Sequence, residues 1–113
     1  MVYLLFILLI AFFSWRLMPP KGVRSITTKQ LKQELQDTNK LFIDVRTPKE
    51  YKNRRIEGFE NYPLGTDLSA LTKDKEIILI CQSGMRSLQA AKQLKKLSYE
   101  HVTNVRGGMG AYR

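Results

Sequence analysis

The stretch EIILICQSGMRSLQAAKQLKKL, residues 76–97, decides the predicted fold. Four apolar residues in a row, 77–80, are typical of a strand that is buried on both faces of a sheet. After a short loop, apolar side chains return at helical spacing, at Leu88, Ala91, Leu94 and Leu97. The loop begins with Cys81, the one cysteine of this chain of 113 residues. The stretch therefore predicts a strand, a loop and a helix, with a thiol where the strand ends.

The same alternation of apolar runs and helical patterns continues on both sides of this stretch. Further strands or extended segments are predicted over residues 41–45, 60–65 and 101–105. Further helices are predicted over residues 29–36, 47–53 and 66–72. Either Thr27 or Thr28 can cap the first of these helices, and Thr47, followed by Pro48, can cap the second. This order of elements predicts an α/β fold, a small parallel sheet of about five strands flanked by helices.

The N-terminal stretch differs from the rest of the chain. Residues 2–13, VYLLFILLIAFF, are all apolar, and the apolar character resumes at residues 17–18. As a helix, residues 2–18 would span roughly 25 Å, slightly less than the bilayer core of about 30 Å. A cleaved signal peptide is not indicated, because there is no charged start and no small-x-small cleavage site. The alternative that this segment is a helix buried in a protein core remains, although no second domain is available to cover such a helix.

We therefore expect three parts: a transmembrane anchor over residues 1–18, a linker over 19–22 and one domain over 23–113. Basic residues follow the apolar run and no charged side chain precedes it, which favours a single-pass protein with its C-terminal domain in the cytoplasm. A single cysteine fits a reducing compartment, because no internal disulfide can form. The net charge of +9 suits a basic surface near anionic lipid. Nucleic-acid binding is not expected, because no motif for it accompanies the charge.

The loop after the central strand has the features of an anion site. Ligands of open α/β sheets bind beyond the carboxyl ends of the strands. Successive backbone N–H groups of the loop can converge on one point, Gly84 allows the backbone angles this needs, and the following helix adds its positive end. The pKa of Cys81 should then fall below the free value of about 8.5. The alternative is a buried cysteine that acts as a small apolar residue.

Four stretches of the chain resemble rhodanese-like (sulfurtransferase) domains. CQSGMRS, residues 81–87, is similar to the active-site loop C-x-x-G-x-R-S of that family. FIDVRTPKEY, RIEGFENYPL and VTNVRGGMGAY are similar to three further family motifs and occur in the same order. The likeness covers essentially residues 23–113. Arg55, Phe59 and Tyr112 depart from it, since the family often has His, Ala and Trp there, and the first two changes are expected to alter the substrate mouth.

The resemblance implies a sulfurtransferase similar to thiosulfate sulfurtransferase. Cys81 would take the outer sulfur of a donor such as thiosulfate as a persulfide and pass it to a thiophilic acceptor. The substrate-binding residues would be Gln82, Ser83, Gly84, Met85, Arg86 and Ser87. Arg86 could attract an anionic donor or form a salt bridge. Asp44 and Arg46 would be supporting residues: Asp44 could touch the loop but is expected to hold neighbouring backbone, and Arg46 could pair with Glu50 and brace the short helix. No metal and no organic cofactor is expected.

Two other functions remain possible at this point. Cysteine phosphatases have five residues between Cys and Arg, whereas four separate Cys81 from Arg86, and the shorter loop should fit one sulfur better than a phosphate. A non-catalytic, membrane-tethered sulfur carrier or redox-sensing module would have the same loop. The donor, the acceptor and the oligomeric state stay open.

Overall fold

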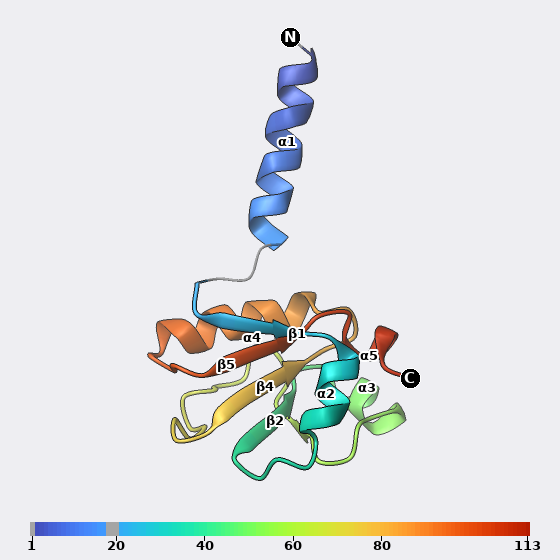
Figure 1. Ribbon diagram of the computed structural model, residues 1–113, viewed down its shortest axis with the longest axis vertical. Coiled ribbons are helices and arrows are strands. Elements are labelled where there is room, and N and C mark those ends of the chain that lie inside the picture. The colour runs from blue at the N-terminus through green and yellow to red at the C-terminus, as the bar shows by residue number, and fades with distance from the viewer. Residues whose placement is uncertain (1, 18–20) are drawn as a thin grey trace.

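A parallel five-stranded sheet forms the centre of the domain (Figure 1). The computed structural model describes residues 2–17 and 21–113. The strand order is β1-β5-β4-β2-β3, and every neighbouring pair is parallel. The strands are β1 (Val23–Ile26), β2 (Lys40–Asp44), β3 (Glu60–Asn61), β4 (Glu76–Ile80) and β5 (Val102–Val105). The predicted α/β class and parallel sheet are confirmed.

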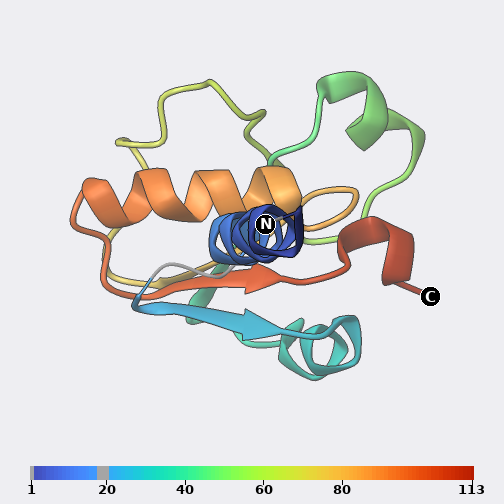
Figure 2. The ribbon, with the colours of Figure 1, turned by 90° about the horizontal axis from the view of Figure 1, so that it is seen from above.

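Helices cover both faces of this sheet, which Figure 2 shows from above. The helices of the domain are α2 (Thr28–Glu34), α3 (Pro48–Asn53), α4 (Met85–Lys96) and α5 (Gly108–Ala111). Ile77 and Leu79 of β4 share a core cluster with residues of α4, whereas Ile78 and Ile80 share the other cluster with Leu31 of α2. Residues 77–80 are thus buried on alternate faces, which explains why they are all apolar.

Two helices begin where the sequence predicted. Thr27 caps α2 and Thr47 caps α3, and each forms a reciprocal capping box with the residue three positions later, Gln30 or Glu50. The side-chain oxygen of each threonine accepts a hydrogen bond from a backbone N–H group that lacks a partner within the helix. These local contacts fix the start of α3 beside the end of β2.

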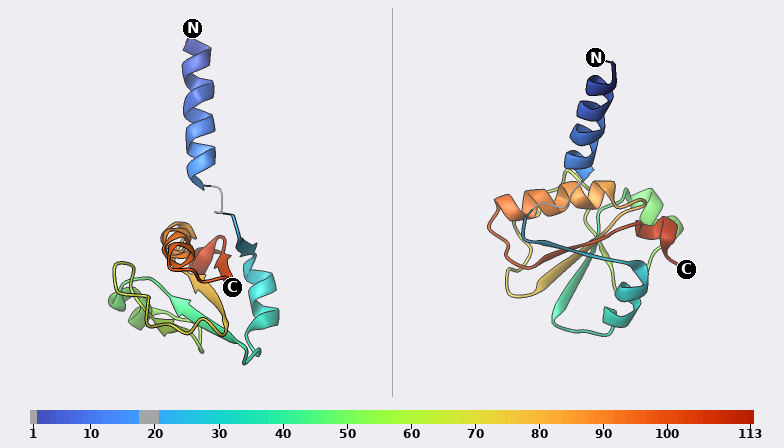
Figure 3. Two further views of the ribbon diagram at one scale, coloured as in Figure 1. Left: turned by 90° about the vertical axis from the view of Figure 1, so that its left-hand side faces the viewer. Right: turned by 45° about the horizontal axis from the view of Figure 1, so that its top comes forward.

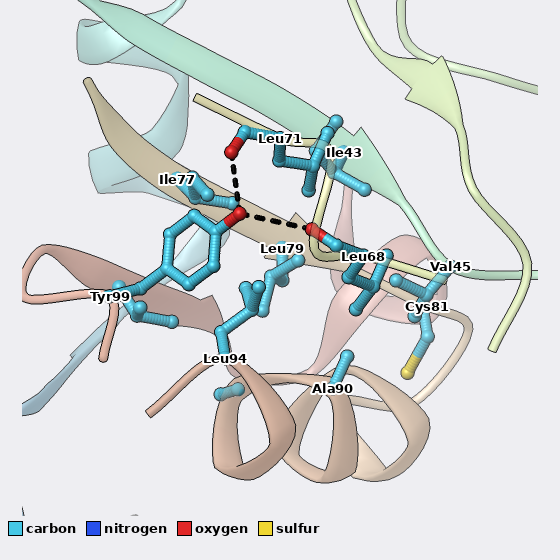
Figure 4. Close-up of a cluster of buried hydrophobic side chains, with 12 residues drawn as sticks. Ile43, Val45, Leu68, Leu71, Ile77, Leu79, Cys81, Ala90, Leu94 and Tyr99 are labelled. Atoms are coloured by element: carbon cyan, nitrogen blue, oxygen red, sulfur yellow. Dashed lines mark hydrogen bonds between the residues drawn. The ribbon is translucent and has the colours of Figure 1, made fainter. Parts of the chain in front are cut away.

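The prediction of a helix over residues 66–72 is wrong. This segment is irregular, although Leu68 and Leu71 are buried in the cluster beneath α4. The hydroxyl of Tyr99 reaches the backbone carbonyls of both residues (Figure 4). Tyr99, some thirty positions away, therefore supplies the donor to the Leu71 carbonyl, whereas the Leu68 carbonyl also accepts from the N–H of Leu71. Strand β1 was not predicted either; it has one buried residue, Ile26, and pairs only with β5.

Helix α1 (Val2–Leu17) extends away from the sheet and its covering helices (Figure 3). Its large apolar side chains are exposed to solvent, from 47% for Leu9 to 81% for Tyr3. Its 16 residues correspond to about 24 Å, and no helix within the described residues is long and apolar enough to cross a membrane. The predicted transmembrane helix is therefore not found there. Met1, Met18, Pro19 and Pro20, which belong to the predicted anchor and linker, lie outside the described residues.

Candidate active site

Cys81 lies at the carboxyl end of β4, between the ends of β2 and β5. The loop that follows is short, because α4 begins at Met85 with Gly84 as its N-cap. Gly84 has a φ of 98°, in the left-handed region that glycine adopts without strain. This sharp turn from strand to helix directs the first N–H groups of α4 back towards the cysteine sulfur.

The thiol accepts hydrogen bonds from this turn. The backbone N–H of Gly84 donates to Sγ over 3.0 Å, and the Ser87 hydroxyl donates over 3.4 Å. Burial of the thiol raises its pKa and is the largest single influence. Hydrogen bonds from the Ser87 hydroxyl and from the backbone of Ser87, Ser83 and Gly84 together outweigh it, so the pKa of Cys81 lies below its ordinary value. The arrangement favours a thiolate, as the sequence predicted.

The alternative view of Cys81 also has structural support. Its side chain is fully buried and belongs to the core cluster with Val45, Leu68 and Ala90 (Figure 4). The sulfur is therefore both part of the packed core and the acceptor of the loop N–H groups. No part of Cys81 is exposed to solvent in this structure.

The C-terminal turn holds the other side of the loop. Met109 donates its N–H to the carbonyl of Cys81 over 2.8 Å, and Gly110 donates to that of Gln82 over 2.9 Å. Gly108 has a φ of 55°, and a Cβ atom there would lie 2.2 Å from the Cys81 carbonyl oxygen. Only glycine allows this close approach. These bonds to the loop carbonyls were not predicted from the sequence.

Arg86 is held in an ion pair. Its guanidinium donates to both carboxylate oxygens of Glu50, over 2.7 and 2.9 Å, and both side chains are about one-third exposed. The hydrogen bonds from Arg86 are the main reason why the pKa of Glu50 falls to about 2. Of the two roles considered for Arg86, the structure shows the salt bridge, which joins the first turn of α4 to α3.

The expected pairing of Arg46 with Glu50 is wrong, because each has another partner. Arg46 forms an ion pair with Asp44, with 2.6 Å between Nη2 and Oδ2, and both side chains are buried. Arg46 also donates to the carbonyl of Arg54, so it links the end of β2 to the end of α3. Asp44 and Arg46 therefore brace the strand end next to the site and do not contact the sulfur within hydrogen-bond distance.

Two asparagines near the loop were missed by the sequence analysis. Asn61 donates to the carbonyls of Asp44 and Arg46 and fixes the end of β2. Asn104 of β5 donates to the carbonyl of Gly84 over 3.3 Å. Nothing in the local sequence pattern identifies either asparagine, because the carbonyls that they bind lie at least 15 positions away in the sequence.

The described residues contain no cluster of three or more His, Cys, Asp and Glu side chains that could hold a metal ion. What the site offers instead is one thiol of lowered pKa surrounded by N–H and O–H donors. Such a site stabilises negative charge on sulfur and suits covalent chemistry of the thiolate.

The family model of the Rhodanese-like domain matches residues 27–113. The chain belongs to the rhodanese-like domain family. It forms a single small domain of this family, with the strand-end cysteine in the loop that the resemblance indicated.

Relatives of this rhodanese-like domain carry names that fit the site. A protein named sulfurtransferase from Allochromatium vinosum is 35% identical over 94 residues, which cover 80% of this chain and 88% of that protein. A putative sulfurtransferase, YtwF, from Bacillus subtilis is also 35% identical and covers 80% and 90%. The crystal structure of a rhodanese-like domain protein from Staphylococcus aureus matches with a TM-score of 0.71 and 30% identity, over 80% of this chain and 91% of that one.

The departures from the family motifs have structural explanations. Phe59 is buried in the core against Phe42, with 5.3 Å between the ring centroids, so it adds to the packing beneath the sheet. Arg55 is exposed and its guanidinium lies over the ring of Tyr51. Tyr112 lies beneath the ammonium group of Lys32. The expected effect of Arg55 and Phe59 on the substrate mouth stays a prediction.

Proposed function

We propose that this protein is a sulfurtransferase that carries sulfur as a persulfide on Cys81. The observation that supports this most directly is the lowered pKa of the Cys81 thiol, produced by N–H and O–H donors around one sulfur atom. A persulfide anion needs the same donors as a thiolate, so one loop can stabilise both forms of the enzyme. The sulfurtransferase names of two relatives at 35% identity agree with this chemistry.

Each half-reaction transfers one sulfur atom. With thiosulfate as donor, the Cys81 thiolate attacks the outer sulfur, the S–S bond of thiosulfate breaks, and sulfite leaves with the bonding electron pair. The outer sulfur of the resulting persulfide is then attacked by a thiophilic acceptor, and Cys81 leaves again as a thiolate. The lowered pKa of Cys81 increases the fraction of the protein in which the attacking sulfur is a thiolate, and that fraction needs no general base.

Mass spectrometry of the full chain after incubation with thiosulfate tests this function. We expect the mass to increase by one sulfur atom, and the increase should disappear on addition of cyanide as thiocyanate forms. Cys81→Ser, which keeps the size of the side chain but replaces the thiol, should show no gain. A wild-type protein that remains unmodified with thiosulfate and with other sulfane donors would overturn the proposal.

A second candidate is a sulfur carrier or redox-sensing module without useful turnover. The complete burial of the Cys81 side chain favours it, because a closed loop protects a bound sulfur and slows its exchange. Steady-state rates distinguish the two functions. An enzyme should transfer sulfur from thiosulfate to cyanide over many cycles, whereas a carrier should stop after one sulfur per chain.

We also propose that α1 attaches the domain to a membrane, with the domain on the cytoplasmic side. The exposed apolar side chains along α1 support this attachment. So do the basic residues, Arg16 in the last turn of α1 and Lys21 and Arg24 after it, which suit an anionic membrane surface. Flotation of the full chain with phosphatidylglycerol–phosphatidylcholine vesicles tests the attachment. Replacing Ile7 and Ile10 together by lysine should abolish flotation, and unchanged flotation would contradict the proposal.

A further inference from the structure

Gly84 connects the reactive sulfur to the end of β5. Its N–H donates to Sγ of Cys81 over 3.0 Å, while its carbonyl accepts from the N–H of Leu88 over 3.2 Å and from Nδ2 of Asn104 over 3.3 Å. A Cβ atom at Gly84 would lie only 3.2 Å from the backbone nitrogen of Gly107. The active-site turn is therefore packed directly against the backbone that follows β5, and the direction of its N–H depends on this contact.

Asn104 is a buried polar residue on an apolar face of the sheet. Val102, two positions earlier on the same face of β5, belongs to the core cluster beneath α4. Among the described residues the side chain of Asn104 makes one hydrogen bond, the one from Nδ2 to Gly84, and its buried Oδ1 has no partner. A buried oxygen without a partner destabilises a fold. Asn104 therefore lowers stability through Oδ1, and its contribution through Nδ2 goes to the turn that holds the sulfur.

The hydrogen bond from Asn104 is not needed to satisfy the carbonyl of Gly84. That carbonyl already accepts the N–H of Leu88, which closes the first turn of α4. A carbonyl with one partner is not left unsatisfied when a second donor is removed. What the bond from Asn104 adds is a constraint from the neighbouring strand, which fixes the orientation of Gly84 relative to β5.

We propose that Asn104 is a positioning residue for sulfur transfer: it holds the carbonyl of Gly84 and thereby keeps the N–H of Gly84 directed at the sulfur of Cys81. Asn104 does not donate to the sulfur itself and acts through Gly84, which does. Without this constraint the N–H can turn away, and its hydrogen bond to a thiolate or a persulfide anion weakens as the angle worsens. The inference rests on the proposed sulfur transfer and names a residue on which the charge of the reacting sulfur depends.

The charges around the loop do not depend on Asn104. The charged side chains that pair beside the loop or lie next to it are Arg86 with Glu50, Asp44 with Arg46, and the exposed Arg106. None of these groups is hydrogen-bonded to Asn104 in the described part of the chain. When leucine replaces Asn104, a change in the ionisation of Cys81 would therefore come from the donors to its sulfur, and not from a charge gained or lost.

Asn104→Leu tests this role, because leucine is similar in size and removes both Nδ2 and the unpaired oxygen. Alkylation of the full chain by iodoacetamide reports on Cys81 alone, since the chain has no other cysteine. We expect the pKa of Cys81 to rise, so that the alkylation rate at pH 7, relative to its plateau at high pH, falls roughly three- to tenfold, the effect of weakening one hydrogen bond. Single-turnover persulfide formation from thiosulfate at pH 7 should slow by a similar factor. The urea midpoint should not fall, because the carbonyl of Gly84 keeps its bond from Leu88 and the unpaired oxygen is gone.

Asn61→Leu is the matched control. Asn61 also donates to carbonyls at a strand end, those of Asp44 and Arg46, but it makes no hydrogen bond to the active-site turn in the described residues. This variant should lower stability and leave the pH profile of alkylation unchanged. If Asn104→Leu does not fold, Asn104→Ala removes the same donor without adding apolar bulk and should show the same change in the pH profile.

The pH profile decides the outcome. An unchanged profile in the Asn104 variants, with or without a loss of stability, would show that Asn104 does not position the turn and would refute the inference. Equal changes in Asn104→Leu and Asn61→Leu would also refute it, because the effect would then be a general loosening of the strand ends. A wild-type protein that forms no persulfide would overturn the sulfurtransferase proposal and this inference with it, whereas normal persulfide formation with an unchanged profile would overturn this inference alone.

Discussion

Gly108→Ala tests whether the C-terminal turn sets the geometry of the active-site loop. A methyl group at this position would meet the Cys81 carbonyl oxygen at 2.2 Å and the carbonyl carbon of Gln82 at 2.8 Å. Both atoms are backbone, so neither can swing away as a flexible side chain would. The carbonyl must retreat to at least 3.0 Å, and the hydrogen bond from Met109 to it must lengthen or break.

The expected losses follow from these contacts. A left-handed alanine costs about 1–2 kcal/mol, and the loss of one backbone hydrogen bond costs about 1 kcal/mol more. We therefore expect the free energy of unfolding to fall by about 2–3 kcal/mol. The rate of persulfide formation should fall roughly a hundredfold, the usual result of displacing a reacting group by about an ångström.

Gly65→Ala is the matched control for this variant. Gly65 also has a positive φ, 98°, but an added Cβ would meet no atom within 4 Å. It should lose about 1–2 kcal/mol of stability through backbone strain alone and keep its rate of persulfide formation. Urea unfolding followed by circular dichroism and single-turnover persulfide formation measure the two quantities. If Gly108→Ala and Gly65→Ala behave alike in both assays, the turn does not position the loop.

Three further changes test other contacts of the domain. Ser87→Ala removes the hydroxyl that donates to Sγ, so the pKa of Cys81 should rise and the rate of alkylation at pH 7 should fall roughly three- to tenfold; an unchanged pH profile would contradict this role. The pKa of Glu50 is lowered in the folded state, so its pairing with Arg86 stabilises the protein above pH 4.5 and is lost as the pH falls towards 2. Because both groups are about one-third exposed, we expect this loss to be about 1 kcal/mol, and Glu50→Gln should remove that part of the pH dependence. Tyr99→Phe leaves the carbonyl of Leu71 without the hydroxyl that donates to it, whereas the carbonyl of Leu68 keeps the N–H of Leu71; the change should cost about 1–3 kcal/mol in urea unfolding, and a neutral result would show that water replaces the hydroxyl.

The features that the sequence predicted correctly are those that depend on neighbouring residues. The apolar run of β4, the spacing of Leu88 and Leu94 in α4, and the cap of α3 by Thr47 all arise within one element. The thiolate site could be predicted for the same reason, since Cys81, Gly84 and Ser87 lie within seven residues of one another.

The features that were missed depend on contacts between distant residues. Glu50 lies 36 positions from Arg86, so the sequence offered Arg46, four residues from Glu50, as an equally reasonable partner. The buried hydroxyl of Tyr99 acts on carbonyls about thirty positions away, where the local pattern favoured a helix. The partner of Glu50 and the conformation near Leu68 and Leu71 depend on which groups are buried together in the folded chain. The spacing of residues along the sequence does not reveal this.

The pairing of Arg86 also bears on which reaction the loop can carry out. A cysteine phosphatase needs an arginine that holds two oxygens of the phosphate, whereas here both terminal nitrogens of Arg86 are occupied by the carboxylate of Glu50. The hydrogen bonds to the sulfur therefore come from neutral donors, the N–H of Gly84 and the hydroxyl of Ser87. Neutral donors in a small loop can stabilise one sulfur anion, but they do not offset the two charges of a phosphate monoester. This distribution of charge favours sulfur transfer over phosphate hydrolysis, independently of the number of residues between Cys81 and Arg86.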